Sequence, residues 1–312
     1  MQDDKLTLED LLGVSKMPND LDERINNVAI IGAGTMGQGI GQTIAAQGIE
    51  VKIIEIDHSH LEFAKQQLNE NIDREIKRWA MTNSDKKAIF SRIKWETSIE
   101  GAKDCEIIIE AVQEDFNVKK DVFQKLDKIA LDYAIFVSNT STLSLTKLSE
   151  TINRSDKVIG MHFLNPVPKI PMVELVKCLH TSNDTVSKIK DFASRIGKTP
   201  VEVYEYPGFI TTRAIVPLIN EAMHILLEGV ATAKDIDTAL KLGYNFQYGP
   251  LEMADSMGLD EVLTWMETLW STLGEPRYRP NPLLRKLVRE RKLGKKTGEG
   301  IFKYDEHGNK LN

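Results

Sequence analysis

The sequence predicts an α/β fold, with an N-terminal doubly wound parallel sheet followed by a C-terminal all-helical domain. Short β-branched runs alternate with helical segments through the first part of the chain, which is typical of a parallel sheet covered by helices on both faces. After about residue 206 the strand-like runs become rare and helical patterns dominate. The 312 residues are enough for two domains.

Each expected element rests on a local pattern. Apolar runs predict buried strands, and apolar side chains at helical spacing predict helices. The expected strands are residues 28–31, 51–56, 106–111 and 134–138, and the expected helices between them are 38–47 and 59–80. The expected C-terminal helices are 210–229, 233–241, 251–273 and 282–291.

The predicted division is an extension at 1–26, a sheet domain at 27–206 and a helical domain at 207–312, with Pro207 and Gly208 at the boundary. The helical domain is expected to bind substrate and to form a dimer. The extension is expected to be a short helix packed on the body or a loose tail. Its apolar residues are Leu6, Leu8, Leu11, Leu12 and Val14.

Composition narrows the classes of function. The chain is 41% apolar and 28% charged, which is ordinary for a globular protein, and its net charge of −6 argues against a nucleic-acid binder. No apolar run approaches the length that crosses a bilayer, and the N-terminus lacks the pattern of a secretory signal, so a cytoplasmic location is expected. Cys105 and Cys178 are too far apart to indicate a disulfide framework or a metal site.

Two further polar clusters are interpreted as structural. His58 and His60, with the acids just before them, could be drawn as a metal site, but exposed residues at the start of a helix are expected instead. The basic stretch 285–296 is expected to be a solvated helix face with a tail, and contact with an anionic ligand is the weaker alternative.

A glycine-rich turn follows the first expected strand. Residues 28–37 read Val-Ala-Ile-Ile-Gly-Ala-Gly-Thr-Met-Gly, which fits G-x-G-x-x-G between a strand and a helix. Gly32 would permit the tight turn, Gly34 the close approach of a pyrophosphate, and Gly37 the packing of helix on strand. Thr35 and Met36 lie where the N-terminus of the helix attracts phosphate. The pattern predicts a Rossmann-like dinucleotide site, and a turn without a cofactor is the alternative.

An acidic residue near the end of the second expected strand indicates which dinucleotide would bind. Glu55 lies 18 residues after Gly37, where a carboxylate accepts both ribose hydroxyls and repels a 2′-phosphate. No arginine stands beside it, which favours NAD over NADP. Asp57 is a rival for the same role.

His162 and Glu174 form the candidate catalytic pair. His162 lies in an expected strand at 158–163, and Glu174 follows it after a proline-containing segment that predicts a loop. If the two runs pair antiparallel, the carboxylate orients the imidazole and stabilises its protonated form. The free ring nitrogen could then take a proton from a substrate hydroxyl. A purely structural histidine–glutamate pair is the alternative.

The run Ser138-Asn139-Thr140-Ser141 follows the strand at 134–138. Hydroxyl and amide side chains at a strand's carboxyl end lie where α/β folds bind ligands. A cap for a helix beginning near Leu143 is the alternative, and different members of the run could serve each role.

From residue 27 to about 305 the sequence resembles the L-3-hydroxyacyl-CoA dehydrogenase family, in particular its 3-hydroxybutyryl-CoA type. The matching motifs are residues 32–37, 110–115, 138–141, 162–166, 207–209, 249–250 and 295–300. The resemblance implies NAD as cofactor, an acyl-CoA substrate, a homodimer, and a place in fatty-acid or butanoate metabolism. It implies that His162 is the base, that Glu174 orients it, and that Ser141 holds the 3-oxygen of the substrate.

The resemblance also implies binding residues. Asn165 would lie near the nicotinamide, Glu114 and Lys119 would bind that half of the cofactor, and Glu55 fits the ribose acid better than Asp57. The helix at 59–80 would carry coenzyme A contacts. Asn71 and Arg78 stand where a serine and a lysine usually make them.

One position departs from the family pattern. Thr212 stands where the family has an asparagine that binds substrate and helps to position the base. A threonine hydroxyl has a shorter reach and no amide. Two alternatives therefore stand beside the acyl-CoA dehydrogenase: an NAD-dependent dehydrogenase of a different hydroxy acid without coenzyme A, and an NAD-binding protein without catalysis.

Overall fold

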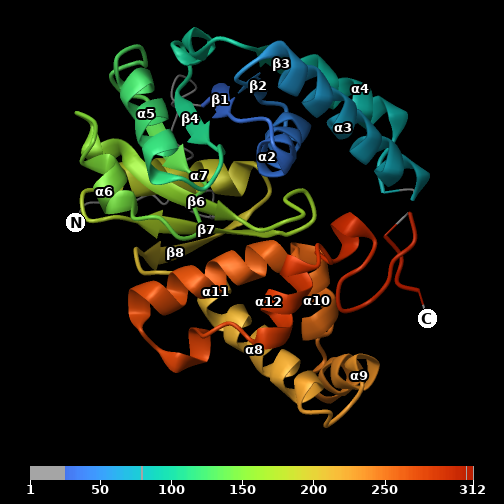
Figure 1. The fold of residues 1–312 in the computed structure, drawn as a ribbon. Helices are drawn as coiled ribbons and strands as arrows, with labels where there is room; N and C mark the ends of the chain where they lie inside the picture. Colours follow the sequence, from blue (N-terminus) through green and yellow to red (C-terminus); the bar gives the residue numbers. More distant parts are fainter. Residues whose placement is uncertain (1–24, 79, 307, 312) are drawn as a thin grey trace, which may run out of the picture.

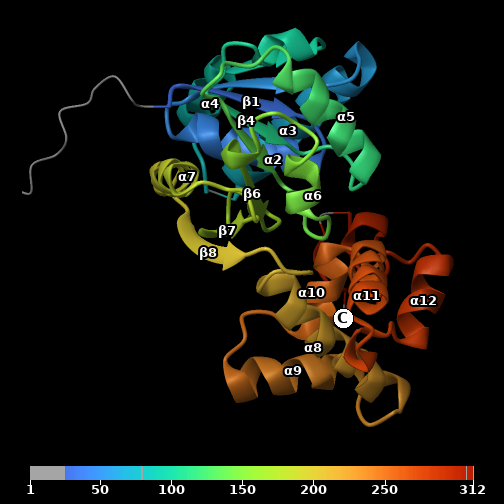
Figure 2. The ribbon, with the colours of Figure 1, turned by 90° about the vertical axis from the view of Figure 1, so that its left-hand side faces the viewer.

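The computed structural model describes residues 25–78, 80–306 and 308–311. The extension expected at 1–26, with its apolar set, lies almost entirely outside the described residues. The described chain forms a sheet domain and a helical domain, joined where β8 leads into α8 (Figure 1 and Figure 2). The expected fold class is confirmed. Within this described part, no helix combines the length and the apolar character that spanning a membrane requires.

Within the described residues, eight strands form one sheet in the order β3-β2-β1-β4-β5-β6-β7-β8. Neighbouring strands run parallel except β6 and β7, which are antiparallel. The strands are β1 (Asn27–Ile31), β2 (Glu50–Ile54), β3 (Ile93–Glu96), β4 (Ile107–Glu110), β5 (Ile135–Ser138), β6 (Val158–Phe163), β7 (Met172–Lys177) and β8 (Thr199–Tyr204). The order reverses between β1 and β4, and the crevice at such a reversal is where open α/β sheets bind ligands.

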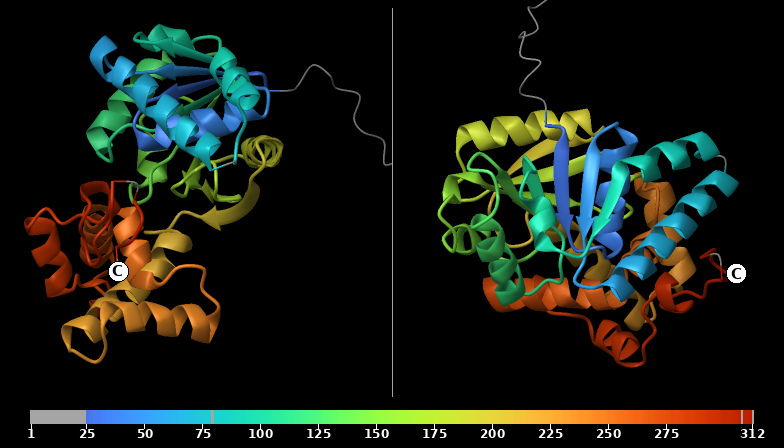
Figure 3. Two further views of the ribbon diagram at one scale, coloured as in Figure 1. Left: turned by 90° about the vertical axis from the view of Figure 1, so that its right-hand side faces the viewer. Right: turned by 90° about the horizontal axis from the view of Figure 1, so that it is seen from above.

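Helices cover both faces of the sheet, as Figure 3 shows from two further directions. Alternate residues of a strand point to opposite faces, so Ile30 of β1 packs under one helical layer while Ala29 packs under the other. The first layer contains α2 (Thr35–Ala46), α3 (His58–Lys77), α4 (Asn83–Arg92) and α7 (Asn183–Arg195), and the second contains α5 (Phe116–Asp127) and α6 (Leu145–Ser149). Because both faces of the sheet are buried, most residues along each central strand are apolar.

The helical domain has a core of its own. Its helices are α8 (Thr211–Leu227), α9 (Ala233–Tyr244), α10 (Pro250–Met257), α11 (Leu259–Leu273) and α12 (Pro282–Arg289). They bury Val216, Met223, Leu259 and Met266 against one another, apart from the core of the sheet domain. The expectation of one helix at 251–273 is wrong, because Gly258, at φ +102°, ends α10 and begins α11.

The structure also contains elements that the sequence patterns did not predict. Helix α4 buries Ile89 alone along its length, so it has no apolar stripe to reveal it. Its signature lies instead at its start, where Thr82 and Asp85 form a reciprocal capping box. Helices α5 and α7 are amphipathic and flank the strands that carry the candidate site.

Candidate active site

The glycine-rich turn lies at the reversal of strand order, between β1 and α2. A Cβ at Gly37 would stand 1.9 Å from the carbonyl oxygen of Gly32, and Gly32 itself has φ +101° with the backbone of Ala111 against it. At Gly34, by contrast, a Cβ would meet no atom within 4 Å. Two glycines therefore serve packing and one leaves open space, as a turn shaped for a pyrophosphate requires.

The start of α2 is suited to bind an anion. Gly34 is its N-cap, and no described side chain bonds to its first N–H groups. Thr35 is exposed and Met36 is half-buried at this terminus. Free N–H groups and the positive end of the helix dipole favour phosphate here. The described residues thus fit the dinucleotide that the sequence predicted.

The structure distinguishes the two acids after β2. Glu55 Oε2 accepts a hydrogen bond from Ala33 N at 2.7 Å, so its carboxylate faces the glycine-rich turn. Asp57 caps α3 and accepts hydrogen bonds from Ser59 and His60. The hydrogen bonds from His60 and Ser59 hold the pKa of Asp57 well below its usual value. Its place at the cap leaves Glu55 as the acid that faces the turn. His58 and His60 are exposed residues in the first turn of α3, as expected.

His162 and Glu174 lie directly opposite each other across the antiparallel pair β6 and β7. His162 Nδ1 stands 2.5 Å from Glu174 Oε2, and the two residues are 4% and 0% exposed. The antiparallel pairing predicted from the sequence is therefore confirmed. With Nδ1 held by the carboxylate, the tautomer and the ring orientation are fixed and Nε2 is left for other partners.

Glu174 also joins the two domains. Its Oε1 accepts hydrogen bonds from Ile210 N and Thr211 N, and its Oε2 accepts one from Thr211 Oγ1 at 2.9 Å. Burial opposes ionisation, but the hydrogen bonds from His162 and Thr211 hold the pKa of Glu174 below its usual value. The buried carboxylate is thus favoured in its ionised form by His162 itself and by residues at the start of the helical domain.

The other side of the imidazole is packed by an aromatic ring. The ring centroids of His162 and Phe209 are 5.4 Å apart. Phe209 has φ +48°, a conformation that residues other than glycine rarely adopt. Such backbone strain persists where the surrounding structure enforces it, and often at functional sites. Phe209 and Glu174 together hold the histidine ring.

The segment after β5 carries Ser141 towards the same place. Asn139 Oδ1 accepts a hydrogen bond from Phe163 N, next to His162 in sequence, at 3.1 Å. Ser141 is half-buried, and β5 lies beside β6 in the sheet. The alternative of a helix cap does not hold for residues 138–141, because Ser144 caps α6.

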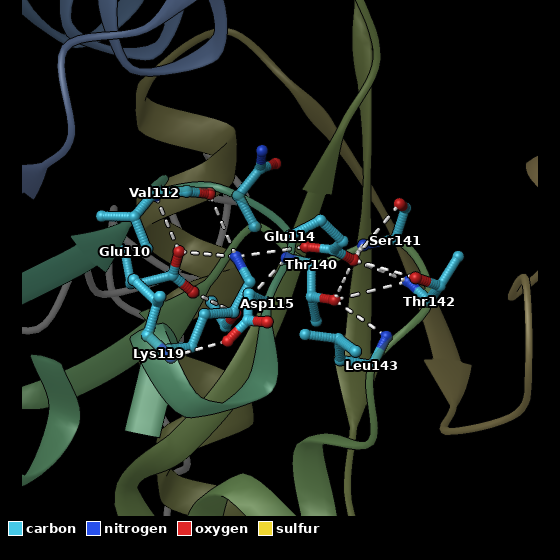
Figure 4. A network of polar contacts seen from close by, with 12 residues as sticks. Glu110, Val112, Glu114, Asp115, Lys119, Thr140, Ser141, Thr142 and Leu143 are labelled. Atoms are coloured by element: carbon cyan, nitrogen blue, oxygen red, sulfur yellow. Dashed lines mark hydrogen bonds and ion pairs between the residues drawn. The ribbon is translucent and has the colours of Figure 1, made fainter. Parts of the chain in front are cut away.

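A polar network connects this segment to the end of β4 and the start of α5 (Figure 4). Lys119 Nζ lies 2.6 Å from Glu110 Oε1 and 3.2 Å from Glu114 Oε2. Glu110 also accepts a hydrogen bond from Ser138 Oγ at 2.6 Å. Burial raises the pKa of Glu110 despite the neighbouring Lys119 charge.

Comparison with known proteins shows to which family the chain belongs. The family model for the 3-hydroxyacyl-CoA dehydrogenase NAD binding domain matches residues 27–206, and that for the C-terminal domain matches residues 208–304. The chain belongs to the 3-hydroxyacyl-CoA dehydrogenase family.

Individual relatives match over nearly their whole length. A probable 3-hydroxybutyryl-CoA dehydrogenase of Bacillus subtilis is 41% identical over 90% of this chain and 98% of its own. The 3-hydroxybutyryl-CoA dehydrogenase of Clostridioides difficile is 40% identical over 89% of this chain and 99% of its own. The crystal structure of (S)-3-hydroxybutyryl-CoA dehydrogenase from Ralstonia eutropha superposes with a TM-score of 0.82 at 40% identity, covering 91% of this chain and all of that one.

The structure also places the remaining candidates of this dehydrogenase. Asn165 is exposed in the turn after β6, and Thr212 is 3% exposed in the first turn of α8, one residue after Thr211. Asn71 lies on α3 and accepts a hydrogen bond from Arg74, and Arg78 is the exposed C-cap of that helix. Their roles stay predictions.

The basic stretch near the C-terminus is largely paired with acids. Arg285 contacts Glu267, Lys292 contacts Glu299, and Lys296 Nζ lies 2.6 Å from Asp260 Oδ1. These contacts favour the expected solvated face over an anion site.

Sequence reasoning missed three residues that organise the site. Glu110 ends an apolar strand at the same sheet edge as Ser138. Its position at the carboxyl end of a strand could have indicated a site residue. Phe209 falls within the family motif at residues 207–209, which predicts no individual role for it. Thr211 gave no signal, because it contacts Glu174 across 37 residues of sequence.

We expect Thr211→Val to lower dehydrogenase turnover about fivefold to thirtyfold, because one charge-assisted hydrogen bond to the Glu174 carboxylate is lost. The two backbone N–H donors remain. Steady-state kinetics with a 3-ketoacyl-CoA and NADH measures the effect. Thr211→Ser keeps the hydroxyl and should retain most of the activity. Equal turnover of the valine variant and the wild type would show that the hydroxyl contributes nothing.

Proposed function

We propose that this chain interconverts short-chain (S)-3-hydroxyacyl-CoA and 3-ketoacyl-CoA with NAD, in fatty-acid or butanoate metabolism, and that His162, Glu174 and Ser141 carry the chemistry. The observation that supports these roles best is the buried contact of 2.5 Å between His162 and Glu174 beside a dinucleotide fold. The relatives named above support 3-hydroxybutyryl-CoA as the substrate type.

In oxidation, His162 Nε2 takes the proton of the substrate's 3-hydroxyl while Glu174 stabilises the resulting imidazolium. Ser141 holds the 3-oxygen by a hydrogen bond. The bound NAD supplies the other half of the chemistry by accepting the hydride from C3. In reduction His162 returns the proton to the same oxygen. The low exposure of His162 keeps water away from the proton transfer.

The binding residues follow the fold. The turn Gly32–Gly37 and Glu55 would hold the pyrophosphate and ribose, with Glu114, Lys119 and Asn165 towards the nicotinamide. Asn71 and Arg78 on α3 would contact coenzyme A. Thr212, buried next to Thr211, would line the substrate site in place of the family's asparagine.

The first test is the loss of NADH absorbance with acetoacetyl-CoA, measured beside free acetoacetate at equal concentration. We expect rapid turnover of the thioester alone, because the coenzyme A contacts supply binding energy that the free acid lacks. Turnover of acetoacetate at the same rate would favour a dehydrogenase of free hydroxy acids. NADH binding without turnover of either compound would favour a non-catalytic protein, and Thr212→Asn would be the first variant to make.

His162→Gln should lower turnover by at least about 10²-fold, because glutamine cannot accept the proton. NADH affinity, measured by fluorescence, should stay nearly unchanged because the dinucleotide cradle lies on other loops. A collapse of NADH affinity in this variant would mean that His162 is structural.

We also propose that the enzyme is a cytoplasmic homodimer assembled through the helical domain. Helix α9 buries Ile236 and Asp237 within the described chain and leaves most of its length uncovered. Leu242 and Tyr244 there are 82% and 74% exposed, and Val230 before the helix is 70% exposed. Large exposed apolar patches mark interaction sites, and the same patch on a second copy would cover this one. The free, buried thiols of Cys105 and Cys178 fit a reducing compartment.

Leu242→Lys should convert the dimer to a monomer, because a charge would be buried at the contact. Sedimentation velocity measures the change. Leu179→Lys is the matched control, since Leu179 is 77% exposed in the sheet domain and should leave the dimer intact. A Leu242→Lys protein that still sediments as a dimer would place the interface elsewhere.

A further inference from the structure

The segment between β5 and α6 has no regular secondary structure, although it carries Ser141. Residues 139–144 form neither helix nor strand. A serine that must hold a reacting oxygen needs a fixed backbone, because a displacement of about 1 Å can cost about 10²-fold in rate. The order of this segment therefore has to come from side chains that bond to it.

The Glu114 carboxylate supplies that order. Its Oε1 accepts hydrogen bonds from Thr140 Oγ1 at 2.5 Å, from Ser141 N at 3.0 Å and from Thr142 N at 3.1 Å. The Thr142 hydroxyl donates to the same oxygen at 3.1 Å. Figure 4 shows the segment wrapped around this carboxylate. The Ser141 hydroxyl lies at a long 3.5 Å, which leaves it free to turn to a substrate.

Lys119 holds the other side of the same carboxylate. It is 1% exposed, and its Nζ lies within reach of Glu114 Oε2 at 3.2 Å, Glu110 Oε1 at 2.6 Å and the carbonyl oxygen of Val112 at 3.4 Å. An ammonium has three donors, and three acceptors of the protein surround this one. Lys119 therefore reaches a bound molecule through Glu114, whose side chain is 30% exposed.

The far end of the network is anchored in the sheet. Glu110 is fully buried and accepts hydrogen bonds from Ser138 Oγ and Val112 N. Glu110 and Ser138 are register partners at the ends of β4 and β5. The position of Lys119, and through it of Glu114, is thus fixed by the two strands that precede the segment.

We propose that the Glu114–Lys119 ion pair positions Ser141 for the substrate's 3-oxygen. The proposal rests on the function proposed above and gives these two residues a role beyond the cofactor contacts that the resemblance implies. Lys119 is the buried ion-pair partner that holds Glu114, and Glu114 holds the backbone of residues 140–142. Both are positioning residues that act through the serine.

Lys119→Met tests this proposal, with Lys125→Met as the matched control on the exposed face of the same helix. We expect kcat/KM for acetoacetyl-CoA to fall about 10²-fold in Lys119→Met, a much larger factor than the change in the Kd of NADH. Hydrogen exchange of a peptide covering residues 139–143 should accelerate. Lys125→Met should match the wild type in all three measurements.

Thr142→Val and Thr142→Ser give a second comparison if Lys119→Met folds poorly. The valine removes one donor to Glu114 without touching the ion pair, so kcat/KM should fall about threefold to tenfold, and the serine should restore it.

The opposite pattern overturns the proposal. If NADH affinity falls by the same factor as kcat/KM while residues 139–143 exchange as in the wild type, Glu114 and Lys119 are cofactor contacts alone. Lack of turnover by the wild type would refute the proposed function instead. The exchange measurement needs no substrate, so unchanged exchange in Lys119→Met refutes the positioning role independently.

Discussion

The architecture depends on the hydrogen-bond donors that a few buried carboxylates require. Removing an ionised carboxylate from water is costly unless donors replace the lost hydration. Four of the described carboxylates are only 0–2% exposed, and each accepts hydrogen bonds from segments other than its own: Glu110, Glu174, Asp237 and Asp255.

Glu110, on β4, accepts hydrogen bonds from β5 and α5. Glu174, on β7, is bonded to β6 and to the start of α8. Asp237, on α9, accepts a hydrogen bond from the first turn of α10. Asp255 binds the C-terminal segment through Ile301, Phe302 and Tyr304. These carboxylates can therefore be buried only once the segments that donate hydrogen bonds to them have packed together.

This constraint explains why the site lies at the junction of the domains. The carboxylate of Glu174 holds the imidazole of His162 on one side and the first N–H groups of the helical domain on the other. Orientation of the candidate base is thus coupled to the packing of α8. A substitution at the domain junction should therefore alter the rate of proton transfer by His162, even where the substituted residue contacts neither substrate nor cofactor.

The sequence predicted the parts of this arrangement that follow from local pattern. Apolar runs located β1, β2, β4 and β5, the glycine spacing located the dinucleotide turn, and the spacing of His162 and Glu174 anticipated the antiparallel β6–β7 pair. It did not predict the break at Gly258, because an apolar pattern continues across it and only the backbone reveals φ +102°. Nor could it reveal Thr211, whose contact with Glu174 exists only once the two domains have folded. Long-range polar contacts carry no periodic signal in a sequence.

The three acids nearest the proposed chemistry differ in the basic side chain that accompanies them. Glu110 and Glu114 share Lys119, whose ammonium is buried within hydrogen-bond reach of both carboxylates, so this cluster suits a fixed scaffold. Glu174 is paired with His162, the proposed proton acceptor. A carboxylate beside lysine fixes geometry, whereas a carboxylate beside histidine stabilises one protonation state of a group that can exchange its proton. Glu110 ends β4 and His162 lies on β6, on either side of β5, and the segment that carries Ser141 follows β5. Neighbouring strands of one sheet thus provide both the rigid support and the candidate base that an alcohol oxidation requires.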